Sequence, residues 1–409
     1  MNQKILITNA KAVCPDRIIP DAQILLCDGC IEQISRLHEI RSVETKQVID
    51  AGGGYLMPGF IDIHSDAIEK EIEPRPGAFF DSDLAFTELE KKLPGQGITT
   101  MFHSFSFSGA EWGLREDENA AHIVRRMVNK ARLRTIIRNK IHARFEITNF
   151  AGVEVIQQLL TDGMVDLLSL MDHTPGQGQY PTIDDYRRYM QKTYHLHLDQ
   201  MDQILAEKEK GRSKCDETID QLVQTAKALC VPIASHDDDS PESVLALKHR
   251  GITINEFPVN EAAAHSARSL GNDVCVGGPN IVRGGSSGKA MRAVDAIISG
   301  DANIICSDYY PPSILHAVFK LSQEVMSLPE AVNMATREPA RATFLNRLGT
   351  LTEGNWGDLI IVRFSHEQPV VTDTFVNGDR VFSLNYRIQP RAVKNNEKKG
   401  GVDALHIVR

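Results

Sequence analysis

Six residues of metal-binding type follow short apolar runs, at the points where strands are expected to end. They are His64, Asp66, Glu146, His173, His236 and Asp308. In a closed barrel of alternating strands and helices, the carboxyl ends of the strands meet at one face. A random set of strand ends would hold mostly small or turn-forming residues, so packing does not explain this set. We therefore expect the six side chains to converge and to bind one or two divalent ions.

The types and spacing of four of these residues favour a metal site. His64 and Asp66 are two positions apart, so on an extended segment both point to the same face and can bind one cation. His173 and His236 add neutral nitrogen donors, which suit Zn²⁺, Mn²⁺ or Fe²⁺. We expect a divalent metal, with Zn²⁺ as the first choice.

The two remaining acids have different expected roles. Glu146 is a carboxylate that could bridge two ions, although it could instead form an ion pair with Arg144 on the same face of its strand. Asp308 is the expected catalytic residue as well as a ligand. It can accept a proton from a water whose pKa a metal lowers to about 7.

The other histidines and several aspartates are expected to have structural roles. The histidines without a partner at ligand spacing are His103, His122, His195, His197, His265 and His316. Asp237, Asp238 and Asp239 follow His236 directly. We expect at least one of these aspartates to cap the helix that the run from Pro241 predicts, because aspartate and serine favour that position.

A glycine-rich segment, residues 280–289, is the best candidate for binding an anionic group. Its glycines would let backbone N–H groups approach an anion, and a following helix would offer its N-terminus. Arg283 can bind phosphate or phosphonate oxygens in bidentate fashion. The expected substrate-binding residues are Arg283, Ser286 and Lys289 in this segment, with Lys70, Arg75 and Gln177 from loops at the same rim.

The elements that would position these residues alternate between strand and helix. Apolar runs predict strands at residues 59–64, 97–105, 141–148, 165–173, 231–236, 252–257, 273–278 and 303–308. Helical patterns separate several of these runs, at residues 118–138, 183–210 and 217–229. Apolar strands with intervening helices predict an α/β fold, a parallel sheet closed into a TIM-like (β/α)₈ barrel.

The two ends of the chain predict a second, smaller β domain. Residues 1–57 and 351–385 contain short strands with turns, and Asn377-Gly378 is a strong signal for a hairpin. We expect a small β-sandwich domain from both chain ends, residues 1–57 and 346–409, the latter including a charged C-terminal tail. The barrel would then occupy residues 58–345.

Composition limits the class of partner. The net charge of -9 argues against a nucleic-acid or anionic-membrane surface, which would need a basic excess, so the expected partner is a small molecule. The seven cysteines are scattered, and the N-terminus lacks the pattern of a signal peptide, which favours a reduced cytoplasmic protein. Cys27 and Cys30 form a CxxC around an Asp28-Gly29 turn, which favours two hairpin residues over a zinc site. The composition does not determine the oligomeric state, and it is compatible with a homo-oligomer.

Two segments resemble the amidohydrolase superfamily. The run AGGGYLMPGFIDIHSD, residues 51–66, is similar to the passage from the superfamily's small β domain into its first barrel strand. The run EGNWGDLIIV, residues 353–362, is similar to its return to the β domain. Most members carry His-x-His at the first strand, whereas this chain has His64-Ser65-Asp66.

Within the superfamily, the similarity is greatest to the diphosphatases of the carbon–phosphorus lyase pathway. The segments that carry it are HSDAIEKEIEPRPG, SLMDHTPGQGQY, ASHDDDS, NEFPVNEAAAHSAR, GGPNIVRGGSSGKA and CSDYYP. This resemblance implies release of pyrophosphate from a ribose 5-triphosphate that bears a methylphosphonate at C1. It also implies that the six residues named first are the metal site and proton acceptor.

Two other interpretations use the same sequence features. Another amidohydrolase would act on a C–N bond, as a cyclic amidase, a deacylase or a deaminase, with the same ligands but little need for cations in its pocket. A non-catalytic member would keep the barrel as a binding or scaffolding module, because a fold does not establish a function. That interpretation predicts missing ligands, whereas all six positions are filled.

Overall fold

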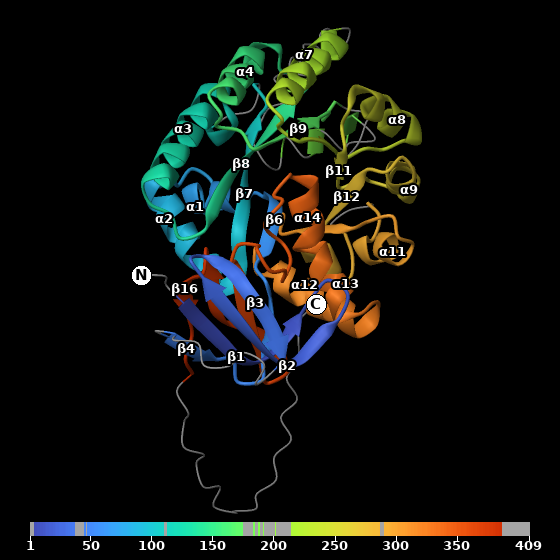
Figure 1. Cartoon of the computed structure of the whole chain (residues 1–409). Helices are drawn as coiled ribbons and strands as arrows, with labels where there is room; N and C mark the ends of the chain where they lie inside the picture. Colours follow the sequence, from blue (N-terminus) through green and yellow to red (C-terminus); the bar gives the residue numbers. More distant parts are fainter. Residues whose placement is uncertain are drawn as a thin grey trace, which may run out of the picture.

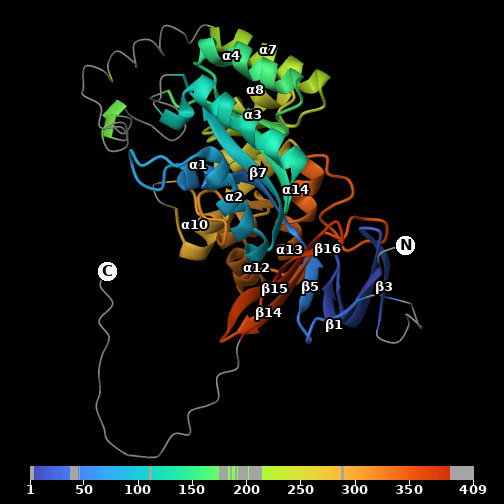
Figure 2. The same ribbon diagram turned by 90° about the vertical axis from the view of Figure 1, so that its left-hand side faces the viewer.

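The computed structural model describes residues 4–36, 45, 47–109, 113–174, 183–184, 187–188, 191, 201, 214–286 and 290–386. In this part of the chain, a barrel of strands and helices stands beside a smaller, mostly antiparallel sheet, as Figures 1 and 2 show from two directions. The predicted C-terminal tail, from about Ile388 onward, lies outside the described residues.

The barrel is a parallel sheet whose strand order follows the chain. Its strands are β6 (Phe60–Ser65), β7 (Ile98–Phe107), β8 (Arg138–Glu146), β9 (Leu167–Met171), β10 (Ile233–His236), β11 (Ile254–Glu256), β12 (Asp273–Gly277) and β13 (Ile304–Cys306). A parallel bridge between Ser65 and Asp308 brings the last strand back to the first. The predicted (β/α)₈ fold is therefore confirmed.

The inner face of the barrel is apolar towards the amino ends of its strands and polar at their carboxyl ends. Register places His142 and Arg144 of β8 opposite Leu167 and Ser169 of β9, so alternate residues share the inner face. Towards the amino ends this face is a buried apolar cluster of Ile61, Ile63, Phe102, Leu167, Ala234, Ile254, Cys275, Ile304 and Cys306. The carboxyl ends carry the ionisable side chains, so the barrel has a hydrophobic base and a polar rim.

Helices cover the outer face of the barrel, as Figure 1 shows. They are α1 (Ala67–Ile72), α2 (Ser82–Lys92), α3 (Asp117–Leu133), α4 (Val153–Thr161), α7 (Cys215–Ala228), α8 (Pro241–Arg250), α9 (Glu261–Ser269), α10 (Gly278–Arg283), α11 (Ala293–Ile298), α12 (Ser313–Glu324) and α13 (Leu328–Met334), whereas Ala340 and Ala342 of α14 (Arg337–Ala342) pack with the apolar cluster of the inner face. Single 3₁₀ turns lie at η1 (Pro94–Gln96), η2 (Gly113–Arg115) and η3 (Phe150–Gly152). Their buried faces, with the outward side chains of the strands, form the largest hydrophobic cluster.

The boundary between α3 and β8 differs from the prediction. The helix predicted over residues 118–138 ends at Leu133, and the strand begins at Arg138 instead of residue 141. The buried Glu90 of α2 accepts hydrogen bonds from the Ile136 N–H at 2.7 Å and from the Thr135 hydroxyl at 2.8 Å. These contacts hold residues 135 and 136 in a non-helical connection between α3 and β8. A continued helix could not make them. The helix predicted at 217–229 is α7, and most of that predicted at 183–210 lies outside the described residues.

The chain ends form one smaller sheet. Its strands are β1 (Lys4–Val13), β2 (Ile18–Cys27), β3 (Cys30–Arg36), β4 (Gln47–Asp50), β5 (Tyr55–Pro58), β14 (Leu359–Ser365), β15 (Gln368–Val376) and β16 (Asp379–Ser383). Side chains from both ends, including Ile7, Ile24, Leu359 and Phe375, share one buried cluster. The separate β domain from both ends was therefore predicted correctly, while its boundaries at 57 and 346 stay a prediction.

Two hairpin turns agree with their sequence signals. Asn377 and Gly378 join β15 to β16 with φ of 51° and 75°, the left-handed pair that a two-residue hairpin turn requires. Asp28 and Gly29 do the same between β2 and β3, with φ of 48° and 82°. Cys27 and Cys30 lie opposite each other in the register of this hairpin and form no disulfide.

No helix among the described residues is long and apolar enough to cross a membrane.

The predicted structural role of several histidines fits their positions. His122 is exposed on α3, and His265 contacts Asp301 at 3.0 Å. His103 is buried in β7 and contacts the Asn139 side chain at 2.9 Å. His195 and His197 lie outside the described residues.

We expect His103 to make the fold sensitive to mild acid. Burial lowers the pKa of His103 from 6.5 to about 4, so the folded state favours the neutral ring. The unfolded chain binds the extra proton first, so this stability is complete above pH 6.5 and is lost as the pH falls towards 4. Between pH 7 and pH 5 the loss is about 2 kcal/mol.

Urea unfolding at both pH values would measure this effect. In His103→Gln, whose amide can still donate to Asn139, the pH 5 stability deficit should shrink by about 2 kcal/mol relative to the unsubstituted protein. The exposed His122→Gln serves as the control and should keep the full deficit. An unchanged pH dependence in His103→Gln would contradict this account.

Candidate metal centre

The predicted ligand residues converge at the carboxyl face of the barrel. The described residues contain three overlapping groups whose potential ligand atoms lie within 4.8 Å of one another. The groups are His64, His236 and Glu256; His173, His236 and Asp237; and His64, Asp66 and Asp308. Glu146 joins them because its carboxylate lies 3.1 Å from His173 Nδ1. All six side chains predicted from sequence therefore belong to one continuous cluster.

Glu256 lies at the centre of the cluster. It is the last residue of β11 and is fully buried. Its carboxylate lies 3.0 Å from His64 Nδ1 and 3.5 Å from His236 Nδ1. The Ser169 hydroxyl also donates to it at 2.8 Å. One carboxylate thus faces the Nδ1 atoms of two histidines, so the Nε2 atoms are the nitrogens turned away from it and available as ligand atoms.

The barrel closure positions the group of His64, Asp66 and Asp308. The Asp308 N–H donates to the His64 carbonyl at 3.0 Å, and the Asp66 N–H donates to the Asp308 carbonyl at 2.8 Å. These backbone bonds fix the three residues beside one another, although 242 positions separate Asp66 from Asp308. Asp308 adopts a left-handed conformation, with φ of 55°, which aspartate and asparagine tolerate better than most residues.

The group of His173, His236 and Asp237 lies on the other side of His236. His173 Nε2 is 3.8 Å from Asp237 Oδ2, and His236 Nε2 is 3.6 Å from the same oxygen. The Glu146 carboxylate also accepts a hydrogen bond from the backbone N–H of His173 at 3.2 Å. Glu146 therefore pairs with His173, and the alternative ion pair with Arg144 is wrong.

Arg144 is a buried cation within the cluster. Its Nη1 lies 3.1 Å from Asp66 Oδ1, and its Nη2 lies 3.0 Å from His236 Nε2. It reaches both because it projects inward from β8, two residues before Glu146. The carboxyl face therefore holds a fixed positive charge among its acids and histidines.

The local charges set the protonation of the acids. Burial alone would raise the pKa of Asp66, but the charges of Arg144 and His64 lower it to about 2. Burial, assisted by the nearby Asp66 charge, raises the pKa of Asp308 to about 6. Asp66 is thus ionised at neutral pH, whereas Asp308 can exchange a proton close to neutrality.

The donor set fits a divalent cation. Imidazole and carboxylate groups are the ligands that Zn²⁺, Mn²⁺ and Fe²⁺ share. Several buried ligand-type atoms among the described residues, including His142 Nε2 and Asp237 Oδ2, make no hydrogen bond. Buried polar atoms normally have a partner, so these atoms are suited to be ligands of an ion.

Three members of the cluster were not predicted as site residues. Glu256 carries the same signal as the others, an ionisable residue at the carboxyl end of an apolar strand, and this signal was overlooked. His142 shares the inner face of β8 with Arg144 and contacts Glu256 at 3.6 Å. Asp237 was expected to be a candidate helix cap, but Ser240 caps α8 by accepting the Ser243 N–H. The three aspartates are therefore not caps.

The predicted anion-binding residues lie at different places around the rim. Lys70 of α1 stacks on the Tyr309 ring at 4.6 Å, and Arg283 contacts the Tyr309 hydroxyl at 3.3 Å. Tyr309 follows Asp308, so both cations lie beside the cluster. Arg75 is exposed in the turn after α1. Ser286 is partly buried, and Lys289 and Gln177 lie outside the described residues.

The glycine-rich segment differs from its predicted conformation. Asn280–Arg283 form the last turn of α10, and Gly284 ends that helix with φ of 78°. The N–H groups of Gly284 and Gly285 donate to the carbonyl of Asn280, so they are not available to an anion. The predicted backbone anion site is therefore wrong at these two glycines, because they terminate a helix.

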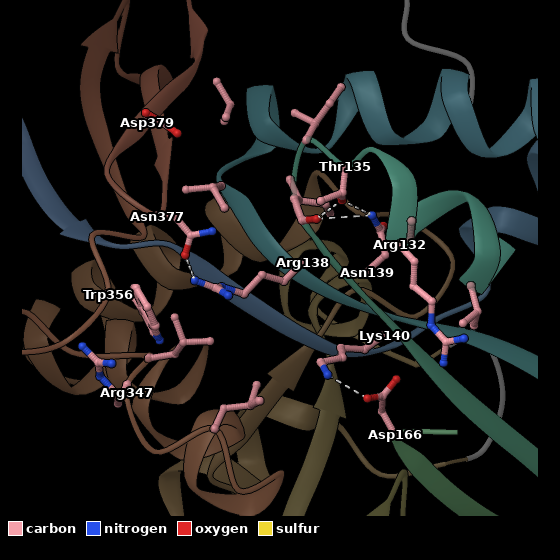
Figure 3. Close-up of a pocket in the computed structure, with 18 of the residues that line it drawn as sticks. Arg132, Thr135, Arg138, Asn139, Lys140, Asp166, Arg347, Trp356, Asn377 and Asp379 are labelled. Atoms are coloured by element: carbon pink, nitrogen blue, oxygen red, sulfur yellow. Dashed lines mark hydrogen bonds and ion pairs between the residues drawn. The ribbon is translucent and has the colours of Figure 1, made fainter. Parts of the chain in front are cut away.

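A separate cavity of about 680 Å³ lies at the opposite end of β8, against the small β domain. Figure 3 shows Arg138, Asn139 and Lys140 from the start of β8 on its wall, with Trp356 and Asn377 across from them. None of the predicted ligand or anion-binding residues lines it. We assign the metal site to the carboxyl face because the three groups of potential metal ligands lie there.

Comparison with known proteins agrees with this geometry. The sequence model of the amidohydrolase family matches residues 55–381. The chain belongs to the amidohydrolase family. This amidohydrolase is 30% identical over 393 residues to the α-D-ribose 1-methylphosphonate 5-triphosphate diphosphatase of Escherichia coli, covering 92% of this chain and all of the relative.

Solved structures share the fold of this amidohydrolase. The L-hydantoinase (dihydropyrimidinase) from Arthrobacter aurescens superposes with a TM-score of 0.62 at 17% identity, over 95% of this chain and 98% of that one. The 5-methylcytosine deaminase from Klebsiella pneumoniae gives a TM-score of 0.63 at 16% identity, over 94% and 100%. At these identities, the likeness establishes the fold and not the substrate.

Proposed function

We propose that this amidohydrolase hydrolyses α-D-ribose 1-methylphosphonate 5-triphosphate to the 5-phosphate and pyrophosphate, in phosphonate catabolism. The observation that carries the proposal is the match to the E. coli diphosphatase along that protein's entire length. The buried Arg144 and the rim cations Lys70 and Arg283 support it, because a triphosphate is a polyanion and a cyclic amide is not.

In this proposal, the ionisable cluster holds one or two divalent ions. The ligands would be His64, Asp66, Glu146, His173, His236 and Asp308, and Glu256 would orient His64 and His236 from behind. Zn²⁺ is the first choice, with Mn²⁺ or Fe²⁺ as alternatives. A bound divalent cation neutralises phosphate oxygens and lowers the pKa of a water to about 7.

The protein's own residues supply the remaining steps. Asp308 accepts the proton of the attacking water, since its carboxylate lies among the potential ligand atoms of His64 and Asp66 at the carboxyl face. Lys70 and Arg283 bind the phosphates so that the attacking water, the phosphorus atom and the leaving oxygen are in line for displacement. The bond between the α- and β-phosphates breaks, and pyrophosphate leaves.

A substrate panel tests this proposal against the amide alternative. The purified protein, supplied with Zn²⁺ or Mn²⁺, would be incubated with the ribose triphosphate, with hydantoins, with N-acyl amino acids and with adenine. We expect the triphosphate to be hydrolysed with the highest kcat/KM. A dominant rate on any C–N bond would make the diphosphatase assignment wrong and leave only the family. Turnover of no substrate, with metal bound, would favour the binding module.

A further inference from the structure

Arg144 contacts the atoms that a metal would need. Asp66 and His236 belong between them to all three ligand groups of the carboxyl face. The Arg144 guanidinium donates to both Asp66 oxygens, at 3.1 and 3.4 Å, and to His236 Nε2 at 3.0 Å. Because His236 Nδ1 faces Glu256, Nε2 is the nitrogen left for a cation. A guanidinium and a divalent cation therefore compete for the same lone pairs.

Like charges add to this competition. Two cations that share Asp66 within a buried site repel each other, and the low local dielectric strengthens the repulsion. The side chain of Arg144 is only 8% exposed, so solvent screens it little. Binding of a metal to Asp66 and His236 thus requires the guanidinium to give up at least one of these contacts.

Among the described residues, the other carboxylates near Arg144 already have partners or, like Asp308 and Asp237, belong to the ligand groups. Glu146, on the same strand, pairs with His173, and Glu256 is surrounded by His64, His142 and His236. Glu69 pairs with Arg115. Arg144 Nε already lacks a hydrogen-bond partner among the described residues. A buried guanidinium without a partner is unfavourable, so it needs an anion from outside the chain.

We infer that Arg144 exchanges partners during binding: the metal takes Asp66 and His236, and the released guanidinium binds a phosphate group of the substrate. This inference rests on the proposed function for the nature of that anion. It makes Arg144 a substrate-binding residue of the carboxyl face, buried where Lys70 and Arg283 are exposed. A triphosphate is recognised there by the planar, multiple donors that suit phosphate oxygens.

Arg144→Met tests the exchange, because it removes the charge and keeps much of the volume. Mn²⁺ affinity would be measured by titration calorimetry without any substrate. Inorganic phosphate would then be titrated into the Mn²⁺-loaded protein after excess metal is removed. We expect Mn²⁺ to bind roughly tenfold more tightly and phosphate to bind at least roughly tenfold more weakly, the loss of one charged hydrogen bond each way.

Lys140→Met is the matched control. Lys140 lies on the same strand and pairs with Asp166 at 2.7 Å, but at the far end of the barrel. This variant loses the same charge and should leave both affinities unchanged. Arg144→Lys keeps the charge yet cannot span Asp66 and His236 together, so it should shift both affinities in the same directions by less. If Arg144→Met does not fold, the affinities of Arg144→Lys provide the test.

Opposite changes in the two affinities identify the exchange. If both affinities fall together in a folded variant, Arg144 only supports the architecture of the site and the inference is wrong. Unchanged phosphate affinity overturns it as well. These readouts involve no turnover, so they separate the inference from the proposed function. A protein that shows the opposite changes but cleaves no triphosphate keeps the exchange and loses the diphosphatase assignment.

Discussion

Asp308→Asn is expected to retain the metal and to lower kcat by roughly 10²–10⁴-fold. The substitution removes the group that accepts the proton of the attacking water while keeping an oxygen ligand of the same size. Asparagine also tolerates the left-handed conformation at this position, where φ is 55°. The backbone bonds that join His64, Asp66 and Asp308 should therefore persist.

Steady-state kinetics and elemental analysis of the purified variant would check this result. Asp295→Asn, on the outer helix α11, provides a control that removes a carboxylate far from the cluster and should keep full activity. If Asp308→Asn loses its metal as completely as a variant of a main ligand, Asp308 is chiefly a ligand and the assignment of the proton acceptor is wrong.

His236→Ala should have the opposite signature, a loss of metal that explains the loss of activity. His236 is shared by two of the three ligand groups, and no other described side chain offers a nitrogen at its position. Loss of an outer partner of a ligand typically lowers metal affinity by roughly 10–100-fold, and loss of the ligand itself should cost at least as much. Activity should return only partly at high metal concentration.

Metal titration of this variant beside His265→Ala provides the comparison. His265 contacts Asp301 on the outside of the barrel and has a 71% exposed side chain, so its loss should not change metal affinity. Normal metal content in His236→Ala would exclude this histidine from the metal site.

The fold was predictable because its signals are local and repeated. The barrel strands contain short apolar runs, and several of them, such as β6, β8, β10 and β11, end at or beside an ionisable residue. The hairpin at Asn377-Gly378 follows from the need for left-handed conformations at both residues. The end of α3 was not predictable in this way, because the buried Glu90, more than 40 positions earlier, determines it.

The candidate site was predictable in its members but not in its pairings. Period-two spacing places Arg144 and Glu146 on one face, yet it cannot say that Arg144 contacts Asp66 from another strand. Asp237 follows His236 directly, and sequence favours a cap there, whereas the structure turns its carboxylate towards two histidines. These pairings depend on the curvature and closure of the barrel, which no local pattern encodes.

Phosphorus NMR of the products from α-D-ribose 1-methylphosphonate 5-triphosphate most directly tests the claim that this carboxyl face cleaves a phosphate anhydride. With metal-loaded protein, the spectrum should lose the triphosphate signals and gain those of pyrophosphate and a 5-monophosphate, with the phosphonate signal preserved. Release of inorganic phosphate with a 5-diphosphate would place the cleavage at the wrong bond. An unchanged triphosphate spectrum would contradict the account.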